Sequence, residues 1–122
     1  MEQCKELKFL RLSRLTHASD FKKVFSSNFR VSDNCITLLV SKNKGQNPRI
    51  GFAVAKKQIK RAVDRNHIKR LFRESFRQKQ YDLPPVDIVV MVRYAILGLS
   101  QQELVVRIDK HWRTIIKRCE NC

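Results

Sequence analysis

Residues 61 to 77, RAVDRNHIKRLFRESFR, combine a helical apolar stripe with a dense run of basic side chains. Four large apolar residues recur at the three- and four-residue spacing that lines up one side of an α-helix: Ile68, Leu71, Phe72 and Phe76. The pattern predicts a helix over about 61–79, whose apolar side needs a sheet or another helix to cover it. The chain must therefore fold around this helix while leaving its other side uncovered.

The other side of the predicted helix carries charge of one sign. Four polar or basic residues lie opposite the apolar stripe: Asn66, Arg70, Arg73 and Arg77. Lys69 flanks them, and Glu74 can pair with Arg70 or Arg77, but one carboxylate cannot neutralise the cluster. From Lys56 to Lys79 there are ten basic and two acidic residues, a net charge of +8 out of +15 for the whole chain. Like charges at helical spacing repel, so an anionic partner is expected.

Nucleic acid is the favoured partner. A solvated helix face is the common fate of a charge run, but such a face normally interleaves both signs. Arginine dominates here, and its planar guanidinium suits bidentate contact with phosphate. The sequence pI of about 10.3 is typical of a nucleic-acid-binding domain. An anionic membrane surface is a further possibility, but the apolar stripe that would face lipid is needed for the core.

Length and composition place the chain in one domain, 1–122, with an ordinary core, because 43% of its residues are hydrophobic. No segment has the length of a transmembrane helix, and no apolar run follows Met1 as in a signal peptide. The cytoplasm is therefore the expected compartment, with no membrane partner.

The first half of the chain predicts one helix and a strand pair. Thr16 is suited to cap a short first helix, whose apolar face would be formed by Phe21, Val24 and Phe25. A strand is predicted at 35–40, and another at 50–55, where large and small residues alternate. Gly, Asn and Pro within 41–48 predict the turn between them.

The last third predicts a buried strand and a closing helix. Pro84-Pro85 prevents the basic helix from continuing. Residues 86–94, VDIVVMVRY, have the near-continuous apolar character of a central strand buried on both faces. Ser100 and Glu103 form an S-x-x-E capping box. A core-facing stripe follows it to the end of the chain: Leu104, Ile108, Trp112, Ile115 and Ile116.

These elements predict an α+β fold, an α/β sandwich with a small, mostly antiparallel sheet and three helices in the order α-β-β-β-α-β-α. They offer few groups for hydrolysis by the protein itself. His67 is expected to contact nucleic acid or solvent, His111 to lie at the surface or boundary of the last helix, and Asp87 at a strand edge. Cys119 and Cys122 form a single C-x-x-C, which with the isolated remaining cysteines favours reduced thiols over a metal site. No catalytic or metal-binding residue is predicted.

The stretch IGFAVAKK, followed by AVDRNHIKRLFRESFR, resembles the signature of the bacterial ribonuclease P protein subunit. The matching positions are Ala62, Arg65-Asn66, Lys69-Arg70, Arg73-Glu74 and Phe76-Arg77. The resemblance extends to FLRLSRLTHASDFKKVF near the start, to DIVVMVR and to the closing amphipathic helix. His67 departs mildly from it, since a longer polar or basic residue often stands there.

This resemblance implies a protein cofactor for a ribozyme that removes the 5′ leader from precursor tRNA, with hydrolysis performed by the catalytic RNA and its magnesium ions. It also implies a left-handed β-α-β crossover, against the usual rule. The residues expected to contact the catalytic RNA are Lys56, Lys57, Arg61, Arg65, Asn66, Lys69, Arg70, Arg73 and Arg77. Phe21 and Phe25 would line a leader cleft between the first helix and the sheet, although core packing is the commoner role for such a pair.

The implied partners are the ribonuclease P RNA and precursor tRNA, with no obligate protein partner. The alternative is a general RNA-binding or ribosome-associated protein with no role in cleavage. Both readings predict a basic helix. Only the first expects the leader of the precursor to matter when the catalytic RNA is present.

Overall fold

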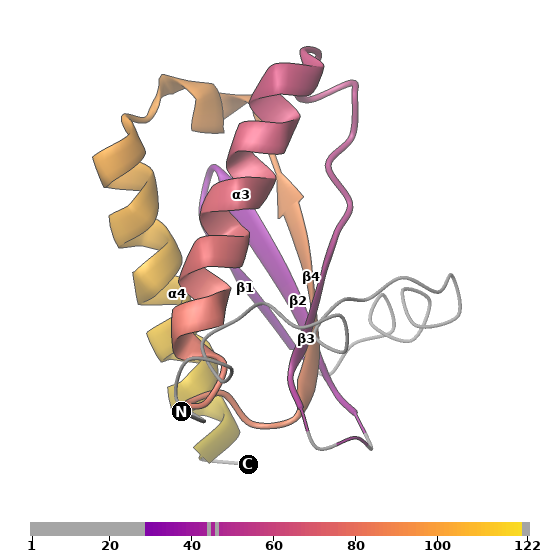
Figure 1. Cartoon of the computed structure of the whole chain (residues 1–122), viewed down its shortest axis with the longest axis vertical. Coiled ribbons are helices and arrows are strands. Elements are labelled where there is room, and N and C mark those ends of the chain that lie inside the picture. Colours follow the sequence, from indigo (N-terminus) through magenta and orange to yellow (C-terminus); the bar gives the residue numbers. More distant parts are fainter. Residues whose placement is uncertain (1–28, 44, 46, 121–122) are drawn as a thin grey trace, which may run out of the picture.

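The computed structural model describes residues 29–43, 45 and 47–120, and this part of the chain folds into a sheet covered by helices (Figure 1). Its elements follow the predicted order from the first strand onward. The predicted first helix, with Thr16, Phe21 and Phe25, lies outside the described residues, as do Cys4 and Cys122. The α+β class is confirmed, whereas the expectation of three helices is not tested there.

The sheet has four strands in the spatial order β1-β2-β4-β3. They span Phe29–Ser32 (β1), Ile36–Lys42 (β2), Arg49–Phe52 (β3) and Val86–Val92 (β4). β2 runs antiparallel to both β1 and β4, and β3 runs parallel to β4. The sheet is therefore mixed but mostly antiparallel, as expected, and the left hand of the β3–α3–β4 crossover stays a prediction.

β4 is the central strand that the apolar run predicted. It pairs on both sides, and every residue in it except Met91 is buried. The strand ends at Val92, two residues earlier than predicted, and a short 3-10 helix, η2 (Tyr94–Gly98), follows. β1 was not located by its residues in advance, because four residues of mixed polarity carry too short a pattern.

Two helices cover the same face of the sheet (Figure 1). α3 (Ala62–Lys79) lies toward β3, and α4 (Gln101–Glu120) lies against α3 and β1. From α3, Ile68, Phe72 and Phe76 are buried and Leu71 is half-buried. The apolar stripe of the basic helix is thus in the core, as its spacing predicted.

Trp112 of α4 joins the two helices. It is fully buried, and its ring meets those of Phe72 and Phe76 edge-on, with centroids 6.5 and 5.9 Å away. Its indole Nε1–H donates a 2.7 Å hydrogen bond to Ser75 Oγ on α3. The aromatic cluster therefore fixes how α4 lies against α3, with the buried indole donor satisfied.

The predicted capping box starts α4. Glu103 N–H donates to Ser100 Oγ at 3.1 Å, and Ser100 N–H donates to Glu103 Oε1 at 2.9 Å. The stripe that follows is buried at Leu104, Ile108 and Ile115 and half-buried at Ile116. In the described helices, no segment is long and apolar enough to cross a membrane.

The interpretation of Asp87 as a strand-edge residue was wrong. It is the second residue of the central strand and only 3% exposed. Arg49 on β3 donates hydrogen bonds to both carboxylate oxygens of Asp87, from Nη2 to Oδ2 at 2.7 Å and from Nε to Oδ1 at 2.8 Å. Asn43 Nδ2 also donates to Oδ1, at 2.8 Å. The carboxylate can be buried because these partners replace its water.

The expectation for His111 was also wrong. It is 6% exposed, and its Nε2 lies 2.8 Å from Asp33 Oδ2 in the loop between β1 and β2. The Asp33 carboxylate also accepts hydrogen bonds from the backbone N–H groups of Cys35 and Ile36. Burial would raise the pKa of Asp33, but these backbone hydrogen bonds and His111 together lower it below its ordinary value. This pairing ties α4 to the β1–β2 hairpin.

Candidate nucleic-acid interface

The loop that leads from β3 into α3 displays lysines around one buried anchor. Ile59 is fully buried, and its N–H donates to the carbonyl of Ala55, closing a tight turn. Lys56, Lys57 and Lys60 in this loop are exposed. Because the anchor fixes the backbone, these ammonium groups project from a defined turn next to the start of the helix.

Arg65 has a structural role in addition to the predicted one. Its Nη1 donates to the carbonyls of Ile59 and Lys60, at 2.8 and 2.9 Å, and the side chain is half-buried. It therefore ties the first turn of α3 to the lysine loop. A guanidinium carries five N–H donors, so this use of one nitrogen is compatible with a further contact to phosphate.

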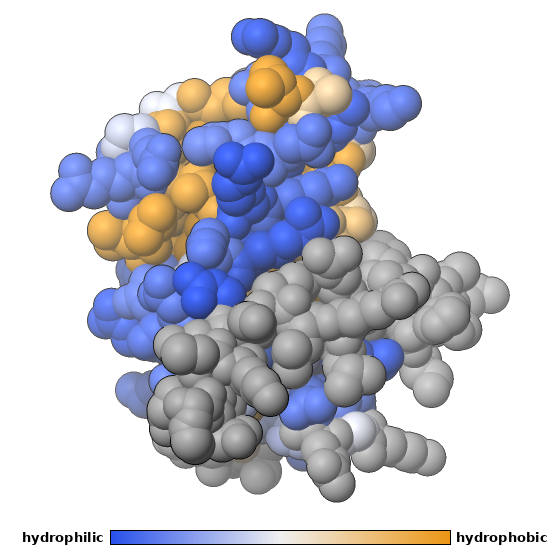
Figure 2. Space-filling view, viewed as in Figure 1, coloured by the Kyte–Doolittle hydropathy of each residue, from blue (hydrophilic) through white to orange (hydrophobic). Residues whose placement is uncertain are grey.

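The remaining predicted contact residues form one continuous surface with that loop. Arg61, Asn66 and Arg70 are exposed, while Lys69 is half-buried on the flank. Figure 2, drawn in the view of Figure 1, shows hydrophilic side chains gathered along α3, with apolar side chains beside them on the side of α4. We call the lysine loop and this side of α3 the basic face: Lys56, Lys57, Lys60, Arg61, Arg65, Asn66, Lys69, Arg70, Arg73 and Arg77.

Arg73 is less open than its position on a helical wheel suggested. Its Cζ lies 5.1 Å from the centroid of the Phe52 ring on β3, and the side chain is half-buried. Phe52 in turn meets Phe72 edge-on at 6.2 Å. The guanidinium of Arg73 therefore packs against the core through the Phe52 ring, in cation–π geometry.

Glu74, one of the two acids between Lys56 and Lys79, forms an ion pair at the far end of the basic face. Glu74 accepts from Arg77 Nη2 at 3.0 and 3.2 Å, one of the two pairings expected from spacing. Arg77 is half-buried. The exposed Arg70 keeps its charge available on the same helix, one turn from Arg73.

Sequence reasoning misplaced or missed two apolar contributions to this area. Val63 falls on the polar side of the helix, so it was expected to pack against another element or at an irregular start of the helix, but it is 60% exposed in the first turn of α3. Tyr94 was treated as the end of a strand, yet it is 72% exposed, and its N–H donates to Gln58 Oε1 of the lysine loop at 3.0 Å. An exposed tyrosine beside a basic loop can stack on an unpaired base. An aromatic residue two positions after a buried strand was the available signal.

His67 is exposed on α3, in keeping with the expected contact with RNA or solvent, and Cys35 is buried. Within residues 29–43, 45 and 47–120, no three His, Cys, Asp or Glu side chains gather as a metal site would require. The predicted leader residues Phe21 and Phe25 lie outside the described part of the chain.

Comparison with known proteins points to one family. The family model described as Ribonuclease P matches residues 9–116. The structure is similar to that of the Staphylococcus aureus RNase P protein, with a TM-score of 0.72 and 25% identity over 88% of this chain and 94% of that one. It is also similar to the RNase P protein from Thermotoga maritima, with a TM-score of 0.64 and 26% identity over 80% of this chain and 96% of the other.

Proposed function

This chain belongs to the ribonuclease P protein family, and we propose that it acts in the cytoplasm as the protein subunit that binds the catalytic RNA and helps it remove the 5′ leader of precursor tRNA. The observation that carries the proposal is the basic face. Its predicted contact residues come together on one surface, while the apolar side of the same helix is buried in the core.

The basic face acts on the RNA through charge. Phosphates of the folded catalytic RNA repel one another, and magnesium ions offset that repulsion. Cations fixed on α3 and its loop take over part of this role, so the holoenzyme needs less magnesium than the RNA alone. Binding is strongly salt-dependent, because each phosphate contact releases condensed counterions.

The chemistry stays with the RNA and its divalent metal ions. The protein contributes affinity, by holding the leader that the mature product lacks. Phe21 and Phe25 are the proposed leader contacts, since stacking of an aromatic ring on a base tolerates any leader sequence. We infer that the sheet face turned away from α3 and α4 forms the other wall of that cleft. Leu39, Ala53 and Met91 are half-buried there around the buried Val89.

Cleavage of precursor tRNA by the cognate catalytic RNA, with and without the protein over a magnesium series, tests the assignment. We expect the protein to shift activity to lower magnesium. Arg70→Gln should weaken this shift, because Arg70 is exposed on the basic face. The matched control is Lys42→Gln, which removes one exposed charge at the end of β2. An unchanged magnesium requirement with wild-type protein would favour a general RNA-binding protein.

The leader contact needs its own test. In the reconstituted holoenzyme, Phe21→Ala should reduce the preference for precursor over mature tRNA, since only the precursor carries a leader. Tyr81→Ala, which removes an exposed aromatic ring after the end of α3, serves as the control. A precursor preference equal to that of wild type would remove Phe21 from the leader site.

A further inference from the structure

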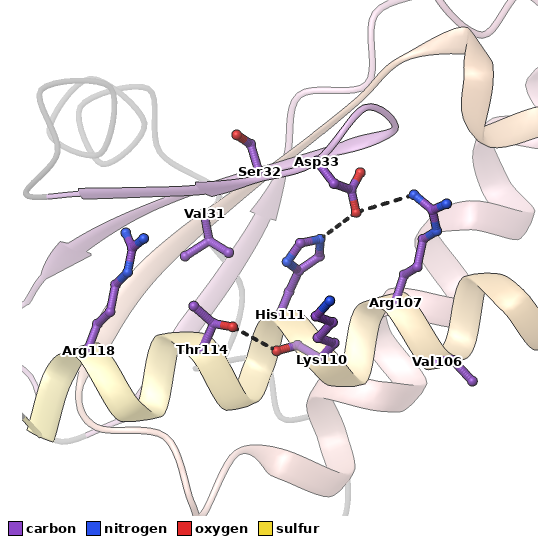
Figure 3. A pocket seen from close by; sticks show the side chains of 9 residues that line it. All are labelled: Val31, Ser32, Asp33, Val106, Arg107, Lys110, His111, Thr114 and Arg118. Atoms are coloured by element: carbon purple, nitrogen blue, oxygen red, sulfur yellow. Dashed lines mark hydrogen bonds and ion pairs between the residues drawn. The ribbon is translucent and has the colours of Figure 1, made fainter.

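A second basic surface lies at the opposite edge of the sheet from the basic face. A groove of about 570 Å³ separates the β1–β2 hairpin from α4 (Figure 3). Its walls are Val31, Ser32 and Asp33 on the hairpin side and Val106, Arg107, Lys110, His111, Thr114 and Arg118 on α4. β1 and β3 are the two edge strands, so this groove beside β1 is distinct from the basic face, where Arg73 lies over Phe52 of β3.

The basic residues of the groove come from one side of α4. Positions 107, 110, 114 and 118, of which 114 is a threonine and the others are basic, recur at three- and four-residue spacing, and Figure 3 shows their side chains rising from the helix toward the hairpin. From Arg107 to Arg118 the helix advances about 16 Å, at 1.5 Å per residue. The groove therefore presents a row of cationic side chains, as an extended polyanion requires.

The one carboxylate in the groove lining is already engaged. Asp33 accepts hydrogen bonds from two backbone N–H groups and from His111, and Arg107 Nη1 lies 3.6 Å from its Oδ2. Arg107 also donates to Asn34 Oδ1 at 2.9 Å. The Asp33 carboxylate is therefore occupied in holding the hairpin against α4. Lys110 and Arg118, both exposed, keep the rest of the groove positive.

Arg118 is held in position at the far end of the groove. Its Nη1 donates to the carbonyl of Arg30 at 3.0 Å, and its Cζ lies 5.6 Å from the centroid of the Phe29 ring. One nitrogen of the guanidinium makes that hydrogen bond, and the group has five donors in all. An arginine ordered in this way loses less side-chain entropy when it meets an anion than a freely moving one does.

We infer that the groove between the β1–β2 hairpin and α4 is a second phosphate-binding site, which holds the backbone of RNA through Lys110 and Arg118. The inference rests on the proposed function for the identity of the anion, since a chain that assembles with RNA meets phosphodiesters first. Both the catalytic RNA and precursor tRNA offer that chemistry. A solvated helix face would instead interleave acids with these cations.

The test measures dissociation constants of the full chain for the cognate catalytic RNA and, separately, for precursor tRNA, over a salt series. The variants are Lys110→Gln and the double variant Lys110→Gln/Arg118→Gln. Lys117→Gln is the matched control, because Lys117 is an exposed cation of α4 that does not line the groove. Arg70→Gln reports on the basic face in the same assay.

We expect each lost phosphate contact to lower the slope of log affinity against log salt by about 0.9 and, near 0.15 M salt, to weaken binding roughly fivefold. Lys117→Gln should leave the slope unchanged. The RNA whose slope responds to Lys110→Gln is the one that occupies the groove. Lys110 makes no contact that holds the hairpin in Figure 3, so this single variant decides the matter even if the double variant fails to fold.

If Lys110→Gln behaves like Lys117→Gln on both RNAs while Arg70→Gln lowers the slope, the groove inference is wrong and the proposed function stands. If Arg70→Gln also leaves the slope unchanged, the basic face itself fails as an RNA contact. The two failures are thus separate outcomes of one set of titrations.

Discussion

The guanidinium of Arg73 lies over the ring of Phe52, with Cζ 5.1 Å from the ring centroid. Phe52 meets Phe72 edge-on, and Phe72 meets Trp112 in the same way. One charged group of the basic face is therefore supported by a row of aromatic rings that ends in the centre of the core. Arg70, one turn away and exposed, lies outside that row.

This difference predicts separable effects of two arginine substitutions. Arg73→Ala should lower the free energy of unfolding by about 1 kcal/mol, because it removes a cation–π contact along with buried side-chain packing. Arg70→Ala should change it by less than about 0.5 kcal/mol. Both should lower the salt slope of RNA binding by about 1. Urea unfolding and salt titrations check the two quantities, and equal stability of the variants would contradict the role given to Phe52.

The Arg49–Asp87 ion pair predicts a large loss of stability when only one of its two partners is removed. Arg49→Met leaves a carboxylate that is only 4% exposed with Asn43 as its remaining side-chain donor. We expect the free energy of unfolding to fall by about 3 kcal/mol. The double variant Arg49→Met/Asp87→Leu should recover part of that loss, since neither charge is then buried. A single variant as stable as wild type would show that water reaches Asp87.

Acid should weaken the link between α4 and the hairpin. The pKa of Asp33 in the folded protein lies below its ordinary value of 3.8, so around that pH the unfolded chain binds more protons than the folded one. This contribution to stability is complete above that value and is lost as the pH falls through the native pKa. From about pH 5.5 to about pH 3, Asp33→Asn should therefore lose less stability than wild type does.

Chemical denaturation at each pH measures this difference. Asp82→Asn, which removes an exposed carboxylate in the turn after α3, is the control and should follow the wild-type profile. Parallel curves for wild type and Asp33→Asn would mean that the hairpin contacts do not depend on the carboxylate charge.

The Ser75–Trp112 hydrogen bond predicts a cost at the interface of the helices. Ser75→Ala leaves the indole N–H of a fully buried tryptophan without that acceptor, which should cost about 1–3 kcal/mol. Fluorescence of Trp112, the single tryptophan of the chain, follows unfolding directly. Ser41→Ala is a suitable comparison, because the Ser41 hydroxyl makes only a long 3.4 Å exposed contact, and we expect it to stay within about 0.5 kcal/mol of wild type.

Substitution of His67 should leave the chemical step intact. His67 is exposed on α3, and the proposed function gives it no role as a proton carrier. In single-turnover cleavage with saturating protein, His67→Ala should lower the rate by far less than the roughly 100-fold that follows removal of a general acid or base. A loss of that size with unchanged RNA affinity would assign chemistry to the protein.

Local sequence patterns were sufficient to predict the helices that bury an apolar stripe. The spacing of Ile68, Phe72 and Phe76 placed α3 and its buried side, and the capping box at Ser100 and Glu103 marked the start of α4. Such signals lie within a few residues of one another, so they can be read without knowing the fold. The short β1 strand carried too little pattern to be located in this way.

For the candidate site, the residue types could be predicted from the sequence, but the contacts that each residue makes are seen only in the tertiary structure. Arg65, Arg70 and Arg73 are arginines of the same predicted helix, yet one holds the lysine loop, one is exposed and one packs on Phe52. The predictions for Asp87 and His111 failed for the same reason, because the partners that allow their burial, Arg49 and Asp33, stand 38 and 78 residues away.

By itself the sequence determined that a basic helix must bury one side and present the other, since spacing and charge are properties of neighbours along the chain. Only the tertiary structure decided which basic side chains make contacts within the protein and which stay exposed to a partner. It alone brought α4 against the hairpin to form the second groove. The physical reason is that the burial of a polar group depends on partners brought together by the strand order, which no local pattern contains.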